Sequence, residues 1–182
     1  MIIVPSLLNS NIYDIQENVK IAKTVGDNYL HIDVMDGNFV PMQSFGGKIL
    51  TDLKKKTDLV LDVHLMINNP ELHIEEYKDA DIISIHQEST KQLYNCLNQI
   101  KKLGEKFIKS TLKKIAELKQ IKDSNKYLFD IEVDGNINDQ TIIPCYTSGA
   151  NVFVSGGYIF GDDNPEQRII KLKNALCNGR IG

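Results

Sequence analysis

The chain has 182 residues, of which 42% are hydrophobic and 25% charged, and its formal net charge at pH 7 is −3. This length and composition predict one domain over residues 1–182 with a sizeable core, and the mild acidity with scattered lysines argues against nucleic acid as a partner. The first residues lack a basic leader, and no apolar run approaches the roughly 20 residues of a membrane span, so we expect neither secretion nor a membrane partner. Three widely spaced cysteines favour the reducing cytoplasm over a disulfide framework or a thiolate metal site.

Short apolar runs alternate with longer amphipathic runs along the chain, which is typical of parallel strands joined by crossover helices. The apolar runs predict strands at Ile2–Ser6, Tyr29–Val34, Leu59–Met66, Ile82–His86, Phe129–Asp134 and Val152–Ser155. The amphipathic runs predict helices at Ile12–Val25, Phe45–Lys56, Pro70–Lys78, Thr90–Leu103, Phe107–Ser124, Asn138–Ser148 and Pro165–Cys177. The pattern indicates an α/β fold with one helix more than six strands require. The surplus lies in Asn98–Ser124, where Gly104 ends one helix and the next begins with no apolar strand between them.

Polar side chains gather at the carboxyl ends of the predicted strands, where α/β folds place their active sites. Residues two apart on a strand point to the same face, so "LHIDV" directs His31 and Asp33 together. Burying an unpaired carboxylate costs several kcal/mol, so Asp33 and Asp134 need a cation, a hydrogen-bond network or a catalytic reason. With His31 and His64 they form a nitrogen and oxygen donor set that suits Zn²⁺, Fe²⁺, Mn²⁺ or Co²⁺, and the sequence does not choose among these metals.

Other residues near these strand ends have simpler interpretations. We interpret His73 and His86 as hydrogen-bonded structural residues, and Asp36 with Gly37 as the turn after a strand. Met35 and Met66 fit ordinary core packing, although thioethers can also line a substrate pocket.

Five motifs occur in the order typical of one enzyme family: "VPSLLNSN", "LHIDVMDGNFVP", "LDVHLMINNP", "IEVDGNIN" and "GANVFVSGGYIF". In these motifs the chain resembles the ribulose-phosphate 3-epimerase family from Ile2 to about Leu172. The resemblance implies a (β/α)8 TIM barrel of the ribulose-phosphate-binding type. It also implies metal-dependent 3-epimerisation of D-ribulose 5-phosphate to D-xylulose 5-phosphate through a cis-enediolate.

The resemblance assigns roles to individual residues. Asp33 and Asp134 would be the two acid–base groups on opposite faces of C3, and one divalent metal ion would be held by His31, Asp33, His64 and Asp134. The substrate contacts that it implies are Ser6, Met35, His64, Met66, Gly135, Asn136, Gly156 and Gly157. A small phosphorylated sugar is thus the expected partner, and the family resemblance also makes a homo-oligomer possible.

The chain departs from the family pattern in three places. Asn136 replaces a second glycine, and Gly157 replaces a common serine. With a polar residue after the Asp-Gly pair, the motif resembles that of the allulose 6-phosphate 3-epimerase branch of the family. That activity is therefore an alternative. The larger departure is an apparent deletion near 104–107, where strands 5 and 6 of the barrel and the helix between them would be missing.

Three explanations of the missing segment stay open: a natural deletion variant, a sequence from which residues of the real molecule are missing, and a rearranged six-stranded protein. Each affects function, because the missing segment normally carries a loop that closes over the substrate. The alternatives to an active epimerase are therefore a catalytically impaired relative that only binds metal or sugar phosphate, and a different barrel enzyme acting on a phosphorylated metabolite.

Overall fold

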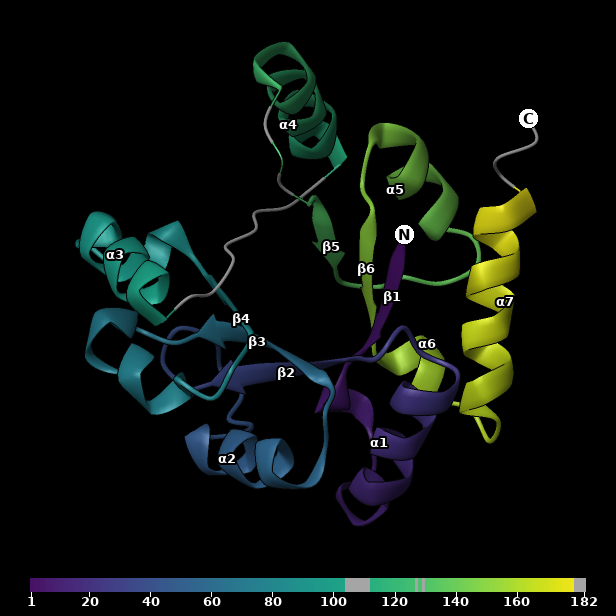
Figure 1. Cartoon of the computed structure of the whole chain (residues 1–182), viewed down its shortest axis with the longest axis horizontal. Helices are drawn as coiled ribbons and strands as arrows, with labels where there is room; N and C mark the ends of the chain where they lie inside the picture. The colour runs from purple at the N-terminus through teal and green to yellow at the C-terminus, as the bar shows by residue number, and fades with distance from the viewer. Residues whose placement is uncertain (104–111, 127, 129, 179–182) are drawn as a thin grey trace. The chain divides into compact units, whose positions relative to one another are not determined.

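A computed structural model describes residues 1–103, 112–126, 128 and 130–178 of the chain (Figure 1). The chain divides into two compact units, one formed by Met1–Asp27 with Ile108–Gly182 and the other by Asn28–Phe107. Each unit contains a three-stranded sheet in which neighbouring strands are parallel. We describe each unit by itself.

The unit of Asn28–Phe107 is built on β2 (Tyr29–Met35), β3 (Val60–Met66) and β4 (Ile82–Ile85), in the order β2-β3-β4. Alternate residues of β2 and β3 are aliphatic and fully buried, as expected of strands that are covered on both faces. Helix α2 (Gly47–Lys56) buries Leu50 and Leu53 and ends in three lysines, which complement the negative end of the helix dipole. Helix α3 (Leu93–Leu103) completes the unit.

The helix predicted at Pro70–Lys78 is wrong, because two 3₁₀ helices occupy this segment: Pro70–Leu72 and Ile74–Tyr77. His73 lies between them with φ −122° and ψ −14°, outside the helical region, so no continuous helix can form. A third 3₁₀ helix, Gln87–Ser89, precedes α3. Thr90 is extended and accepts a hydrogen bond from Gln92 N, which delays the start of α3 beyond the predicted Thr90.

The other unit is built on β1 (Ile2–Pro5), β6 (Val152–Ser155) and β5 (Glu132–Asp134), in the order β1-β6-β5 (Figure 1). Phe153 at the centre of β6 is fully buried in an aliphatic core that helices of this unit also line. The helices are α1 (Ile15–Thr24), α4 (Leu112–Asn125), α5 (Ile142–Ser148), α6 (Gly157–Phe160) and α7 (Pro165–Asn178), and two 3₁₀ helices, Leu7–Asn9 and Ile12–Asp14, precede α1.

All six predicted strands are confirmed, although Phe129 of the fifth lies outside the described residues, as do 107–111 of the fifth predicted helix. Helix α5 starts at Ile142 because the Asn138 carboxamide accepts hydrogen bonds from the backbone N–H groups of Gln140 and Thr141 and holds a turn there. The sequence pattern missed α6, since four residues are too few to show a helical period. The three cysteines are free thiols, and no helix among the described residues is both long and apolar enough to cross a membrane.

Candidate active site on β2 and β3

Six polar or sulfur-containing side chains share one face of the pair formed by β2 and β3. The register places them in three cross-strand rows: His31 beside Asp62, Asp33 beside His64, and Met35 beside Met66. Because residues two apart on a strand point to one face, each strand contributes all three of its residues to that face. The sequence alternation that predicted His31 and Asp33 as neighbours is thus confirmed. The pairing with β3 adds Asp62, His64 and Met66 to the face that also carries Met35.

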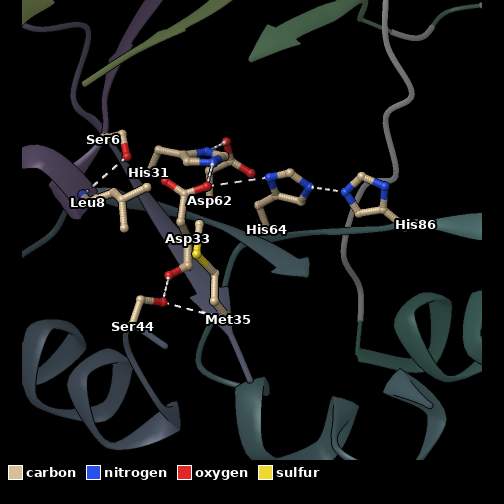
Figure 2. A network of polar contacts seen from close by, with 9 residues as sticks. All are labelled: Ser6, Leu8, His31, Asp33, Met35, Ser44, Asp62, His64 and His86. Carbon is tan, nitrogen blue, oxygen red and sulfur yellow. Dashed lines mark hydrogen bonds and ion pairs between the residues drawn. The ribbon is translucent and has the colours of Figure 1, made fainter. Parts of the chain in front are cut away.

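His31 is fully buried, and Asp62 fixes its ring through Nδ1. Its Nδ1 lies 2.7 Å from Oδ2 of Asp62, which is also fully buried, and its Nε2 lies 3.4 Å from Oδ1 of Asp33 (Figure 2). When Asp62 accepts a hydrogen bond from Nδ1–H, the lone pair of His31 stays on Nε2. This is the arrangement that orients metal-binding histidines in proteins.

Asp33 stands between the two imidazoles. Its Oδ1 is 3.5 Å from His64 Nδ1, and the opposite nitrogen of His64, Nε2, is 2.8 Å from His86 Nε2. His31, Asp33 and His64 each offer one ligand atom, and these atoms lie within 4.8 Å of one another. Two imidazole nitrogens and a carboxylate oxygen at this spacing fit a first-row divalent metal. The other nitrogen of each ring contacts a second side chain, Asp62 for His31 and His86 for His64.

The backbone around Asp33 is held by the loop that follows β2. Ser44 Oγ donates a hydrogen bond to Asp33 O and accepts one from Met35 N at 3.0 Å, and Ser44 N donates to Met35 O at 3.3 Å (Figure 2). The loop therefore folds back over the end of β2. Such support fixes the direction of the side chains that the strand presents.

Asp36 links the loops that follow β2 and β3. Its Oδ1 accepts hydrogen bonds from the N–H groups of Asn38 and Phe39, and its Oδ2 accepts one from Asn68 N at 2.9 Å. Desolvation raises the pKa of this carboxyl, but the backbone hydrogen bonds from Asn68, Phe39 and Asn38 outweigh it and hold the pKa below the ordinary value of 3.8. Asp36 is therefore more than the turn residue that the sequence indicated.

Replacing Asp36 by Asn is expected to lower the free energy of unfolding by about 1 kcal/mol at pH 7. The asparagine carbonyl can keep the bonds to Asn38 and Phe39, but its NH₂ group would face the Asn68 N–H and break the link between the loops. Folding depresses the pKa of Asp36. Its contribution to the free energy of unfolding is therefore complete above pH 3.8, the ordinary pKa, and is lost as the pH falls through the lower pKa of the folded state. Urea unfolding at pH 7 and pH 3 checks this: the difference between wild type and D36N must shrink at pH 3, and a constant difference contradicts it.

Five of the predicted substrate contacts lie in the unit that contains β1, β5 and β6: Ser6, Gly135, Asn136, Gly156 and Gly157. Ser6 N donates to Ser155 O at 3.3 Å, and a Cβ placed on Gly156 would lie 3.2 Å from Ser6 Cβ and from Asn9 Oδ1. Ser155 Oγ donates to Ile137 O at 2.8 Å, which holds the β5–α5 loop against the end of β6. Ser6, Gly156 and Gly157 and the loop after β5 thus share one edge of this sheet.

Asp134 ends β5 in this unit, and its side chain is exposed, in contrast to the buried Asp33. The next two residues turn the chain sharply, because Gly135 has φ 112° and Asn136 has φ 52°. Asparagine tolerates the left-handed region better than most residues, so it can replace the second glycine of the family pattern there. A Cβ on Gly157 would lie no closer than 3.7 Å to Asn9, so the backbone does not require glycine at that position.

Three residues near these strand ends make contacts that sequence reasoning missed: Asp62, Ser44 and Asn9. Asp62 could have been found, since "LDVHLM" repeats in β3 the spacing of two that "LHIDV" shows in β2. His86 was interpreted as a structural residue, and its contact with His64 depends on the pairing of β3 with β4. Nothing in the local sequence signals Ser44 or Asn9, because their contacts cross loops.

Comparisons with solved structures show the fold. A 3-hexulose-6-phosphate synthase is 16% identical with a TM-score of 0.64, covering 96% of this chain and 99% of that one. An orotidine 5'-phosphate decarboxylase from Pyrococcus horikoshii is 17% identical, with the same TM-score and the same coverage. The fold is therefore of the TIM-barrel type, and the described residues supply six of its strands in two parallel sheets.

Comparisons with known sequences show the family. The model of the ribulose-phosphate 3-epimerase family matches residues 2–106 and 102–160. The ribulose-phosphate 3-epimerase of Methanocaldococcus jannaschii is 31% identical over 207 residues, covering 93% of this chain and 88% of that protein. The chloroplastic ribulose-5-phosphate-3-epimerase of Arabidopsis thaliana is 33% identical over 217 residues, covering 95% and 76%. The chain belongs to the ribulose-phosphate 3-epimerase family, whose members are isomerases that act on carbohydrates.

Proposed function

We propose that this protein catalyses the metal-dependent 3-epimerisation of a ketose phosphate, converting D-ribulose 5-phosphate to D-xylulose 5-phosphate. The observation that carries the proposal is the cluster of His31, Asp33 and His64 in a chain of the epimerase family. Buried His and Asp side chains at the carboxyl ends of parallel strands are where this fold does its chemistry.

One divalent ion, Zn²⁺, Fe²⁺, Mn²⁺ or Co²⁺, would be held by His31 Nε2, His64 Nδ1 and a carboxylate oxygen of Asp33. Asp134 is the proposed fourth ligand, on the strength of its matching motif. A bound metal supplies Lewis-acid polarisation of the substrate carbonyl, which stabilises developing negative charge. The donor set favours no one of the four metals.

The acid–base work falls to two carboxylates in this proposal. Inverting C3 requires removal of a proton from a carbon beside a carbonyl and return of a proton to the opposite face. Asp33 and Asp134 are the proposed pair, each removing the proton in one direction of the reaction and returning it in the other. The cis-enediolate of the sugar is the intermediate between the two transfers.

Binding of the sugar phosphate is proposed for the remaining residues that match family motifs. Gly135, Gly156 and Gly157 would hold the phosphate, because backbone N–H groups beside short turns suit an anion, and Ser6 and Asn136 would be further contacts to the substrate. Met35 and Met66 would line the pocket near the reacting carbons. Met35 follows Asp33 by two residues, Met66 follows His64 by two residues, and the two methionines are cross-strand neighbours, which supports this role.

Replacing Gly156 by Ala is expected to raise the KM for ribulose 5-phosphate about tenfold, equivalent to about 1.4 kcal/mol, with a smaller effect on kcat. The new Cβ would press on Ser6 and Asn9 at 3.2 Å, and so displace the backbone that faces the phosphate. Gly46→Ala is the matched control, because a Cβ at Gly46 meets nothing within 4 Å and Gly46 is not a proposed substrate contact. Steady-state kinetics checks both variants, and equal KM values for G156A and wild type would contradict the assignment.

The extent of the domain is also part of the proposal. We infer one epimerase-like domain over residues 1–182, shortened near 104–107 relative to other family members. The family match divides at residues 102–106, and alignments with relatives extend over 207 to 217 positions, more than this chain contains. Strands 5 and 6 of the barrel and their helix are the proposed missing segment. We also propose that the enzyme is cytoplasmic, which the three free thiols support. We propose further that it forms a homo-oligomer, which the family membership supports.

Two other functions have specific observations behind them. Asn136 is a polar residue directly after the Asp134–Gly135 pair, as in the allulose 6-phosphate 3-epimerase branch that the motif resembles, and this favours allulose 6-phosphate as a second candidate substrate. The shorter chain favours a relative that binds metal or sugar phosphate without turnover. Assays of ribulose 5-phosphate and allulose 6-phosphate, with each of the four metals added to chelator-stripped protein, separate these functions. Turnover of ribulose 5-phosphate supports the proposal, and folded metal-bearing protein that converts neither sugar contradicts it.

A further inference from the structure

We propose that an acidic cavity at the start of α7 binds an aliphatic polyamine. The cavity has a volume of about 620 Å³, which is within the usual size range of small-molecule sites. It lies between residues 11–21, which lead into α1 and form its first part, and residues 160–166, which connect α6 to α7 (Figure 1). Both segments belong to the unit that contains β1, β5 and β6. None of the lining residues is a proposed metal ligand or substrate contact, so this binding is independent of the proposed epimerase function.

The lining of the cavity is negatively charged. Five of the described lining residues are acidic, and none of them is a lysine, an arginine or a histidine. Three of the acidic residues make no side-chain hydrogen bond or ion pair with another residue in the described part of the chain: Asp14, Asp163 and Glu166. Charges of one sign around a cleft attract ligands of the opposite sign. The cavity therefore favours a cation.

The other two carboxylates have basic partners that lie outside the lining of the cavity. Glu17 Oε2 accepts a hydrogen bond from Lys20 Nζ at 2.9 Å, and both side chains are mostly exposed to solvent. Asp162 Oδ2 accepts a hydrogen bond from Arg168 Nε at 2.9 Å, which lowers the pKa of Asp162 below its ordinary value of 3.8. The Arg168 guanidinium also lies over the ring of Tyr158, 4.7 Å from its centroid. Both basic side chains are thus engaged with these two carboxylates, and the other three keep their negative charge uncompensated.

Asn18 gives an independent indication of a ligand. It is only 6% exposed, and it lines the cavity from α1. The other two lining asparagines use their Oδ1 atoms in turns, since Asn11 accepts from Tyr13 N at 3.1 Å and Asn164 accepts from Gln167 N at 3.2 Å. The carboxamide of Asn18 makes no hydrogen bond to any residue that the structure describes, and the fold does not seal its polar atoms off completely. Because buried polar groups are nearly always hydrogen-bonded, we expect this amide to pair with a molecule in the cavity.

A polyamine fits this cavity better than a single metal ion does. Within the described residues, none of the carboxylates of the cavity belongs to a group of three metal-ligating side chains whose ligand atoms lie within 4.8 Å of one another. Hard divalent cations need several oxygens that converge on one point. The lining also includes Ile21, Phe160 and Pro165, which offer apolar surface. In a polyamine, ammonium groups would meet the separate carboxylates, methylene groups would cover the apolar residues, and one N–H would donate to the Asn18 carbonyl oxygen.

Isothermal titration calorimetry of the full chain with spermidine, at physiological ionic strength, tests the proposal. Wild type is expected to bind one spermidine per chain. Asn18→Leu keeps the size of the side chain but removes the acceptor oxygen. It should weaken binding about tenfold or more, the contribution of a hydrogen bond to a charged group. Asn18→Asp keeps an acceptor oxygen and should bind spermidine at least as tightly as wild type.

A pair of exposed substitutions tests the role of charge without disturbing the core. Asp163→Asn combined with Glu166→Gln should weaken spermidine binding about fivefold, as expected for two ion pairs at a surface. Glu75→Gln combined with Glu117→Gln is the matched control, because both glutamates are exposed and neither lines the cavity. The control pair removes the same amount of charge and should bind spermidine with wild-type affinity.

Weaker binding in N18L and in D163N/E166Q, with wild-type affinity in the control pair, supports a polyamine site. Wild type that shows no saturable binding of spermidine overturns the proposal. Affinity that falls equally in the control pair also overturns it, since that result indicates attraction to net charge alone. Titrations with Ca²⁺ and with arginine complete the test, and tighter binding of either one than of spermidine contradicts a polyamine site. If circular dichroism shows that N18L does not fold, D163N/E166Q and its control decide the outcome.

Discussion

Replacing Asp33 by Asn is expected to reduce exchange of the substrate C3 proton by about 10²-fold to 10⁴-fold, the usual contribution of a positioned general acid or base. Asparagine keeps the size and can keep the surrounding packing, but it cannot accept the proton. It also replaces the carboxylate that stands 3.4 Å from His31 Nε2 and 3.5 Å from His64 Nδ1. Deuterium exchange followed by NMR at saturating ribulose 5-phosphate measures the effect.

Asp52→Asn is the control for this experiment, because Asp52 is an exposed residue of α2 that pairs with Lys48. It should exchange the C3 proton at the wild-type rate. If D33N retains the wild-type rate while folding normally, Asp33 is not an acid–base group and the two-carboxylate assignment is wrong.

Replacing Asp62 by Leu is expected to weaken binding of a divalent metal about 10-fold to 100-fold and to lower the free energy of unfolding by about 1 to 3 kcal/mol. The substitution leaves the buried Nδ1 of His31 without its 2.7 Å partner, and the ring loses what fixes its orientation and its tautomer. Asp62→Asn should have a smaller effect, since its carbonyl can still accept the hydrogen bond. Competition titrations with a metal indicator and urea unfolding give the two quantities.

Ser84→Ala on β4 is the matched control for Asp62. Ser84 pairs with His64 across the strands, but its buried hydroxyl has no hydrogen-bond partner within the described ranges. Metal affinity should therefore stay at the wild-type value in S84A. Metal affinities in the order wild type, D62N, D62L support the role of Asp62, whereas wild-type affinity in D62L contradicts it.

Much of the fold could be predicted because buried parallel strands are short, apolar and bounded by turns. All six strands were located in this way, and the alternation in "LHIDV" placed His31 and Asp33 on one face before the register was known. Among the residues assigned by resemblance, Met35, His64 and Met66 lie on the same face by the same alternation. In β2 and β3 the three rows from His31 to Met66 follow from strand pairing alone.

The remainder depended on contacts between segments distant in sequence. The helix predicted at Pro70–Lys78 is interrupted at His73. The spacing of apolar residues along a segment does not show that the backbone angles of one residue lie outside the helical region. Asp36 reads locally as a turn residue, but it also accepts a hydrogen bond from Asn68 in the next loop. His86 reads as a lone structural histidine until β4 is paired with β3. Such roles arise from cross-strand and cross-loop geometry, which no local pattern contains.

The most direct test of the central claim is proton NMR of ribulose 5-phosphate in D₂O with the metal-loaded chain, alongside a chelator-treated sample. The account predicts that the C3 proton signal is lost and that signals of xylulose 5-phosphate appear, both only when metal is present. Folded, metal-bearing protein that leaves the C3 proton in place would contradict it.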